Sequence, residues 1–184
     1  MITTINNKKI YLIDEPSYTL NSTDNIRKYN KEIHRDGEFH MTCAHGLISP
    51  ITSIILLGNG GTTGIHNNSL AYKNDLCFIA VSDSVFAMTI PKLEVKWFKK
   101  VDLAACFGIY YLPEKNCLIS WGEVNIVKLA LNGTIIWSCS GADIFTGNFK
   151  IFNHYIEVID FNNQKYMIDL DSGKINFYNQ IVKN

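Results

Sequence analysis

The sequence CLISWGEVNIVKLALNGTIIW (residues 117–137) contains apolar runs separated by polar turns, and it ends in an aromatic residue. A similar stretch precedes it, CFIAVSDSVFAMTIPKLEVKW, and another follows it, EVIDFNNQKYMIDLDSGKINF. The closing residues of the three stretches, Trp97, Trp137 and Phe177, lie 40 residues apart. A fixed period of this length in strand-rich sequence is typical of propeller blades. We therefore expect repeated units of antiparallel strands.

Each unit is predicted to hold four short strands joined by tight turns. The strongest local signal is Asn132-Gly133 between two apolar runs, which is a common hairpin turn because both residues tolerate positive φ. The expected strands cover residues 69–72, 76–81, 85–90 and 94–97 in the first unit, 109–112, 117–121, 125–131 and 134–137 in the second, and 149–152, 155–161, 165–170 and 174–177 in the third. Residues 69–178 are therefore predicted to form three blade-like repeats.

Residues 1–68 fit the period less well and are expected to be an irregular N-terminal portion with strands. Lys9–Asp14 and Ser53–Leu57 read as strands, and the polar segment between them is predicted to hold a short helix near Thr23–Ile33. The whole chain, 1–184, is then a single all-β domain that forms a small or incomplete β-propeller. The N-terminal part either completes a small ring or leaves the propeller open, and we favour the open form.

Composition and charge exclude several classes of function. Of the 184 residues, 47% are apolar and 18% are charged, which is sufficient for a sizeable core. The 17 basic and 17 acidic residues cancel, and no basic tract predicts contact with nucleic acid. No run of about 18 apolar residues predicts a membrane span. Five cysteines without C-x-x-C spacing favour free thiols, so we expect a soluble protein of a reducing cytoplasm.

Candidate chemical motifs are weak. The glycine-rich segment 58–64 lacks the Gly-Lys-Ser/Thr ending of a phosphate loop, and no G-x-S-x-G sequence marks a serine nucleophile. Asp169 and Asp171 precede Gly173, as in a turn, without the spacing of a calcium loop. No spacing of metal-ligand type connects the five histidines, which are His34, His40, His45, His66 and His154. We therefore expect no catalytic residue, no metal and no cofactor.

The third repeat, VIDFNNQKYMIDLDSGKINF, resembles the blade consensus of quinoprotein-type and WD-type propellers, and this likeness covers residues 69–178. The cofactor and metal residues of quinoproteins have no match. More narrowly, Gly122-Glu123 and the string from Gly141 to Phe145 are similar to strings in small, free-standing bacterial cytoplasmic proteins. Some of those proteins resemble immunity proteins of contact-dependent growth-inhibition systems. Trp121 stands where that pattern would have histidine, so a polar role there does not carry over.

These observations lead to the hypothesis of a non-catalytic protein-binding module. The resemblance implies an immunity protein, expected to be monomeric, that binds a cognate bacterial toxin domain and blocks its active site, which would be basic in a nuclease. We expect the partner surface to include Trp121, Glu123, Asp143 and Phe145, although the two aromatic residues also suit packing between blades. The alternatives are a sugar- or small-molecule-binding propeller fragment, suggested by the polar residues at positions 83, 123 and 163, and a scaffold in a cytoplasmic complex.

Overall fold

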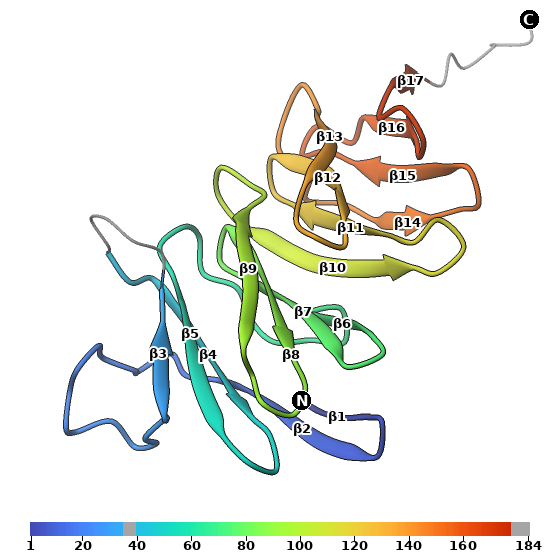
Figure 1. Ribbon diagram of the computed structural model, residues 1–184. Helices are drawn as coiled ribbons and strands as arrows, with labels where there is room; N and C mark the ends of the chain where they lie inside the picture. The colour runs from blue at the N-terminus through green and yellow to red at the C-terminus, as the bar shows by residue number, and fades with distance from the viewer. Residues whose placement is uncertain (35–39, 178–184) are drawn as a thin grey trace, which may run out of the picture.

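The computed structural model describes residues 1–34 and 40–177, and this part of the chain is built from β-strands without a helix. Figure 1 shows the strands gathered into four sheets that follow one another along the chain, which we call blades 1 to 4. Because the described residues contain no helix, none of them forms one long and apolar enough to cross a membrane. The predicted fold class, all-β with four-stranded antiparallel repeats in an incomplete propeller, is confirmed.

Blades 2, 3 and 4 are simple antiparallel meanders in which each strand pairs with the next. Blade 2 holds β6 (Leu70–Lys73), β7 (Leu76–Val81), β8 (Ser84–Thr89) and β9 (Val95–Lys100), blade 3 holds β10 (Cys106–Leu112), β11 (Cys117–Gly122), β12 (Asn125–Ala130) and β13 (Ile135–Ser140), and blade 4 holds β14 (Phe149–Ile151), β15 (Tyr155–Ile159), β16 (Lys165–Asp169) and β17 (Ile175–Phe177). These bounds follow the sequence repeats closely, because local turn chemistry sets where each hairpin reverses.

Blade 1 departs from this plan. It has five strands in the order β1-β2-β4-β5-β3, and β3 pairs with β5 in parallel. The strands are β1 (Ile2–Ile5), β2 (Lys8–Asp14), β3 (Lys31–Ile33), β4 (Cys43–Ile48) and β5 (Ser53–Gly58). The N-terminal portion therefore supplies a full blade. Its edge strand β3 precedes β4 in the chain but pairs with β5, which follows β4.

The helix predicted near Thr23–Ile33 is wrong. Residues 23–30 form turns and bends, and 31–33 form β3. Asparagine side chains explain the difference: Asn25 donates to the carbonyls of Thr19 and Ser22, and the Asn30 side-chain oxygen accepts from the Ser53 amide. Such side-chain hydrogen bonds to the backbone offer the chain an alternative to the helical ladder.

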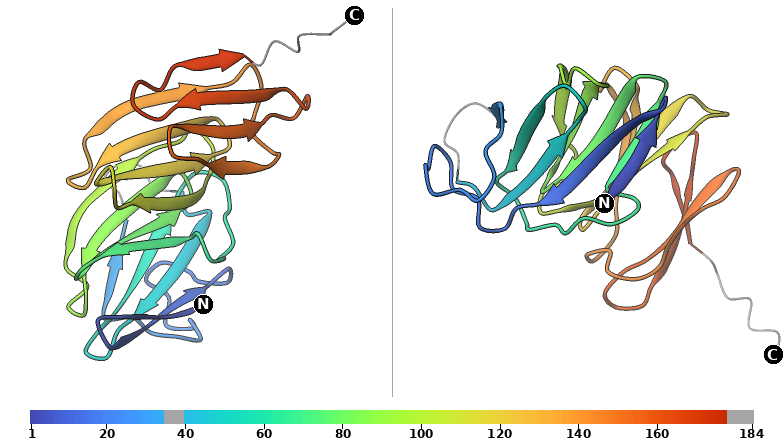
Figure 2. Two further views of the ribbon diagram at one scale, coloured as in Figure 1. Left: turned by 90° about the vertical axis from the view of Figure 1, so that its right-hand side faces the viewer. Right: turned by 90° about the horizontal axis from the view of Figure 1, so that it is seen from below.

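The blades stack face to face, with one apolar cluster between each neighbouring pair. Ile10, Leu56 and Phe86 belong to the cluster between blades 1 and 2, and separate clusters join blades 2 and 3 and blades 3 and 4. The left view of Figure 2 shows this stack running from the N-terminal to the C-terminal blade. No apolar cluster of the described residues joins blade 4 back to blade 1, so the propeller is open.

The repeated tryptophans connect blades. The Trp97 indole N–H, on the last strand of blade 2, donates to the Leu131 carbonyl of blade 3 at 2.9 Å. Trp137 of blade 3 repeats this contact with Leu170 of blade 4 at 3.2 Å. A Cβ atom on Gly133 would lie 2.7 Å from the Trp97 ring, and Gly133 has a φ of +85°, so both space and backbone require glycine there. We call the hydrogen bond from each of these tryptophans to the next blade the indole latch.

Candidate functional site

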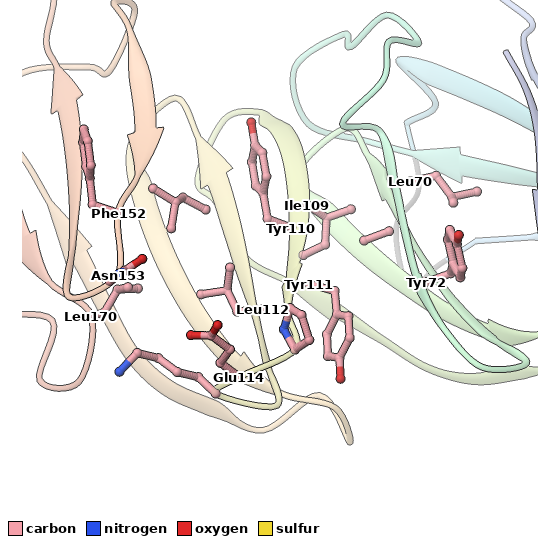
Figure 3. A pocket seen from close by; sticks show the side chains of 14 residues that line it. Leu70, Tyr72, Ile109, Tyr110, Tyr111, Leu112, Glu114, Phe152, Asn153 and Leu170 are labelled. Atoms are coloured by element: carbon pink, nitrogen blue, oxygen red, sulfur yellow. The ribbon is translucent and has the colours of Figure 1, made fainter.

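A groove of about 610 Å³ lies along the first strands of blades 2, 3 and 4. These strands, β6, β10 and β14, are each the edge strand of their sheet, so one side of each carries no ladder partner within that sheet. Figure 3 shows the side chains of Leu70 and Tyr72 on one wall, Phe152 on the other, and the end of β10 between them. In a closed propeller these first strands would surround a central channel.

Aromatic side chains dominate the walls of the groove. Tyr72 is 46% exposed and Phe152 is 40% exposed, which is high for residues of this size. The Phe152 ring stacks on Tyr155 with 4.6 Å between centroids, so its position is fixed by a neighbour. Ile109 and Leu170, also in the lining, are almost completely buried and give the groove an apolar floor.

The rim of the groove carries charges that are mostly paired. The Lys115 ammonium lies 2.8 Å from a carboxylate oxygen of Asp171, which raises the pKa of Lys115 and lowers that of Asp171. Lys73 donates to the side chain of Asn116, and its ammonium lies 5.7 Å from the centre of the Tyr111 ring. This pairing leaves the groove weakly charged and its recognition dominated by apolar and aromatic contacts.

The groove offers surface for binding. Neither histidine nor cysteine is among its lining residues. Within residues 1–34 and 40–177, no group of three His, Cys, Asp or Glu residues is arranged to hold a metal ion. Exposed tyrosines and phenylalanines over an apolar floor are typical of contact surfaces for other molecules.

None of the four residues proposed from the sequence is among the residues that line the groove. Trp121 is half-buried, stacked on Phe149 with 5.1 Å between centroids and 7° between planes. Its indole nitrogen is buried without a hydrogen-bond partner among the described residues. Phe145 has no exposed surface and packs edge-on against Tyr166. Its side chain can therefore affect a partner surface only through the residues that cover it. Both aromatic residues therefore pack as parts of the junction between blades 3 and 4.

The two acidic residues of that set, Glu123 and Asp143, each accept hydrogen bonds from residues between β13 and β14 or within blade 4. The Glu123 carbonyl accepts from the Phe145 amide at 2.6 Å, which ties the turn of blade 3 to the start of blade 4. Asp143 accepts hydrogen bonds from the Ile144 amide and the Asn162 side chain. Both are partly exposed, so Glu123 and Asp143 as partner contacts stay a prediction.

The polar residues at positions 83, 123 and 163 do not line the groove. Asp83 is buried and forms an ion pair with Lys100 at 3.0 Å, while Asn163 is an exposed turn residue with a φ of +62°. Asp83 therefore has a structural role in packing, and Asn163 has one in a turn.

Sequence reasoning missed the groove, although one signal was available. Tyr72, Leu112 and Phe152 lie at intervals of 40 residues, which is the same period as the closing aromatics. Each stands within one residue of the end of the first strand of its blade, beside the turn to the second strand. The period therefore places three large apolar side chains at equivalent positions along one side of the stack, where they line the groove.

Comparison with known proteins supports the fold alone. No protein-family model matches the sequence, and no curated protein does. Among solved structures, BamB from Moraxella catarrhalis is similar with a TM-score of 0.51 and 12% identity over 73% of this chain and 45% of that chain. The WD40 β-propeller domain of Doa1 has a TM-score of 0.47 and 9% identity over 72% of this chain and 46% of that one. The chain thus spans less than half the length of each of these structures.

Proposed function

We propose that this chain is a non-catalytic protein-binding module whose main contact surface is the groove along β6, β10 and β14. The observation that carries the proposal is the pair of exposed aromatic side chains, Tyr72 of blade 2 and Phe152 of blade 4, on either side of an apolar groove that blade 3 also lines. Aromatic residues are enriched among the few side chains that contribute most to protein–protein affinity. A partner that places apolar side chains between Tyr72 and Phe152 would remove both rings from water.

The specific form of the proposal is that the partner is a bacterial toxin domain and the chain its immunity protein. The resemblance of residues 141–145 and the Gly122-Glu123 pair to such proteins supports this form. A tight inhibitor needs roughly 800 Å² of its own surface. The groove with its rims, and the acidic end around Glu123 and Asp143, are surfaces on which such contact could be built.

A growth experiment tests both levels of the proposal. The C-terminal domain of the protein encoded immediately upstream is expressed in bacteria with and without this chain, and growth is measured. We expect the chain to restore growth, and the double variant Tyr72→Ala/Phe152→Ala to lose at least tenfold in affinity for that domain in a titration of the purified proteins. Each truncated aromatic hot spot costs about 1–2 kcal/mol.

The matched control is Tyr11→Ala/Ile136→Ala, which removes two apolar side chains that are 37% and 51% exposed and do not line the groove. This control is expected to bind and protect like the unmodified chain. If the unmodified chain does not restore growth, the immunity form is wrong. If the groove variant binds as tightly as the control, the groove is not the contact surface.

A further inference from the structure

A second site lies in blade 1, away from the groove, around Cys43 and His45. Both residues lie on β4 and, being two positions apart on a strand, their side chains point to the same face. The Cys43 sulfur lies 3.4 Å from Nε2 of His45. A thiol and an imidazole at this distance form the pair that stabilises thiolates in reactive cysteines.

Two further residues complete the surroundings of this pair. Nε2 of His45 lies 2.9 Å from the Thr63 carbonyl oxygen and 3.6 Å from a carboxylate oxygen of Asp14. The Thr63 hydroxyl oxygen accepts from the Ser82 amide at 3.1 Å, so its own proton is available to the Cys43 sulfur, 3.5 Å away. The sulfur is therefore faced by two groups that can donate a hydrogen bond.

The position of the imidazole proton follows from these contacts. All three acceptors, the sulfur and the oxygens of Thr63 and Asp14, lie at Nε2, whereas Nδ1 is buried without a partner among the described residues. These contacts favour a proton on Nε2, and this one N–H is shared between the Thr63 oxygen at 2.9 Å and the Cys43 sulfur at 3.4 Å. His45 acts on Cys43 as a hydrogen-bond donor to a thiolate and not as a base facing a thiol.

Cys43 differs in this respect from the other four cysteines. Burial raises the pKa of the thiols of Cys77, Cys106, Cys117 and Cys139. Burial acts in the same direction on Cys43, but the hydrogen bonds from His45 and Thr63 outweigh it and the pKa of the Cys43 thiol is lowered. Burial acts to lower the pKa of His45, but the contacts with Cys43, Thr63 and Asp14 prevail and raise it.

A cavity gives access to this site. It has a volume of about 250 Å³ and is lined by Cys43 together with Asp14, Glu15 and Thr42, among others. Cys43 itself is 6% exposed. Asp14 and Glu15 give the entrance a negative character, although Arg27 lies 3.0 Å from Glu15 and compensates part of it. The cavity suits a small molecule with a cationic group better than an anionic one.

We propose that Cys43 is a modification site that exchanges with small, amine-bearing disulfides entering this cavity. The Cys43 thiolate attacks one sulfur of the disulfide, a new S–S bond forms between them, and the original S–S bond breaks. The other half leaves as a thiolate and takes a proton from solvent. His45 keeps its proton throughout, because its part is to stabilise the thiolate before attack.

The test uses the purified full chain with cystamine, and with dithiodiglycolate as an anionic disulfide of similar size. At neutral pH we expect a single adduct on the folded protein, which peptide mapping by mass spectrometry assigns to Cys43. The rate should rise with pH around a midpoint below that of the same residue in the urea-unfolded chain, where a thiol has a pKa of about 8.5. Cystamine should react at least threefold faster than dithiodiglycolate at low salt.

Variants separate reactivity from mere exposure. Asp14→Asn, at a residue that is nearly half exposed, removes a negative charge from the cavity lining and should lower the ratio of the cystamine rate to the dithiodiglycolate rate without unfolding the protein. Cys139→Ser is the control and should leave the adduct and its pH profile unchanged. First labelling at another cysteine, or a Cys43 midpoint equal to that of the unfolded chain, would overturn the proposal. Equal rates for the two disulfides would overturn its charge preference.

Discussion

The two ends of the stack are built differently. At the N-terminal end, Tyr18, Leu20 and Tyr29 from the segment between β2 and β3 pack on the outer face of blade 1. At the C-terminal end, the outer face of blade 4 displays Tyr155, Ile159 and Met167, and none of the apolar clusters formed by the described residues includes them. An open propeller must end on two faces that lack a neighbouring blade, and here the chain covers one of them with its own segment.

Polar contacts show the same contrast. The N-terminal cover is held by hydrogen bonds from Tyr18 to Glu32 and from Tyr29 to Glu15, whose carboxylate also binds Arg27. The outer face of blade 4 carries an ion pair, 2.6 Å between Lys165 at the start of β16 and Glu157 in the middle of β15. Charged side chains on a face that would otherwise be apolar protect it from association. One end is therefore closed by packing and the other is protected by charge.

The largest expected effect comes from breaking the N-terminal cover. Tyr29→Ala removes a ring that lies over Gly46, whose missing Cβ makes room for it, and also removes the hydrogen bond to Glu15. We expect the free energy of unfolding in urea to fall by about 2–3 kcal/mol. Tyr155→Ala, the same chemical change on the outer face of blade 4, should cost less than about 1 kcal/mol. Equal losses would show that the two ends do not differ in packing.

A smaller effect is expected at alkaline pH. Burial, together with the hydrogen bond and charge of Glu32, raises the pKa of Tyr18 to about 12. A phenol with a raised folded pKa contributes stability below the unfolded pKa of about 10, and this contribution is lost as the pH rises from about 10 to 12. Tyr18→Phe should cost about 1 kcal/mol at neutral pH.

The measurement is the urea midpoint as a function of pH. Between pH 10 and 12 the midpoint of Tyr18→Phe should fall less steeply than that of the unmodified chain. Tyr155→Phe at the other end serves as the control and should keep the slope of the unmodified chain. A Tyr18→Phe slope identical to that of the unmodified chain would contradict the role of this phenol in the N-terminal cover.

The smallest effect on stability is expected at the C-terminal end. Glu157→Leu/Lys165→Leu should change the free energy of unfolding by less than about 1 kcal/mol, since ion pairs at the surface contribute little and the two leucines replace the packing of the lost side chains. The apparent mass in sedimentation should instead rise with protein concentration, because the face becomes continuously apolar with Ile159 and Met167. Glu94→Leu/Lys96→Leu removes an exposed ion pair of blade 2 and should not associate. If both variants keep a constant mass, charge is not what protects blade 4.

The sequence predicted blades 2 to 4 well because their information is local. Turn residues such as Asn132-Gly133 and alternating apolar positions determine each hairpin within about ten residues. Blade 1 was harder to predict. β4 contains His45 and Gly46 within an apolar strand, and β3 pairs in parallel with β5, more than 20 positions away in register. A parallel long-range pair leaves no periodic signal in the sequence.

The groove and the Cys43–His45 site were likewise predictable from the sequence only in their local part. The 40-residue spacing of Tyr72, Leu112 and Phe152 was present in the sequence, but whether they face solvent depends on how the blades stack. The Cys43–His45 spacing predicts a shared strand face only once β4 is known. The approach of Thr63 and Asp14 to that pair is purely tertiary. Trp121 and Phe145 are apolar enough to serve either a contact surface or a blade junction, and the sequence alone does not separate the two.

The indole latch has a consequence for the order in which the molecule is made. Trp97 binds a carbonyl 34 residues further along the chain, and Trp137 binds one 33 residues further along. During synthesis the N-terminal part of a protein emerges from the ribosome first, at about 5–20 residues per second. The acceptor of each tryptophan is therefore translated a few seconds after the tryptophan itself, when nearly one whole repeat has been added to the chain. The hydrogen bonds between blades 2 and 3 and between blades 3 and 4 can therefore form only after the following repeat has been translated.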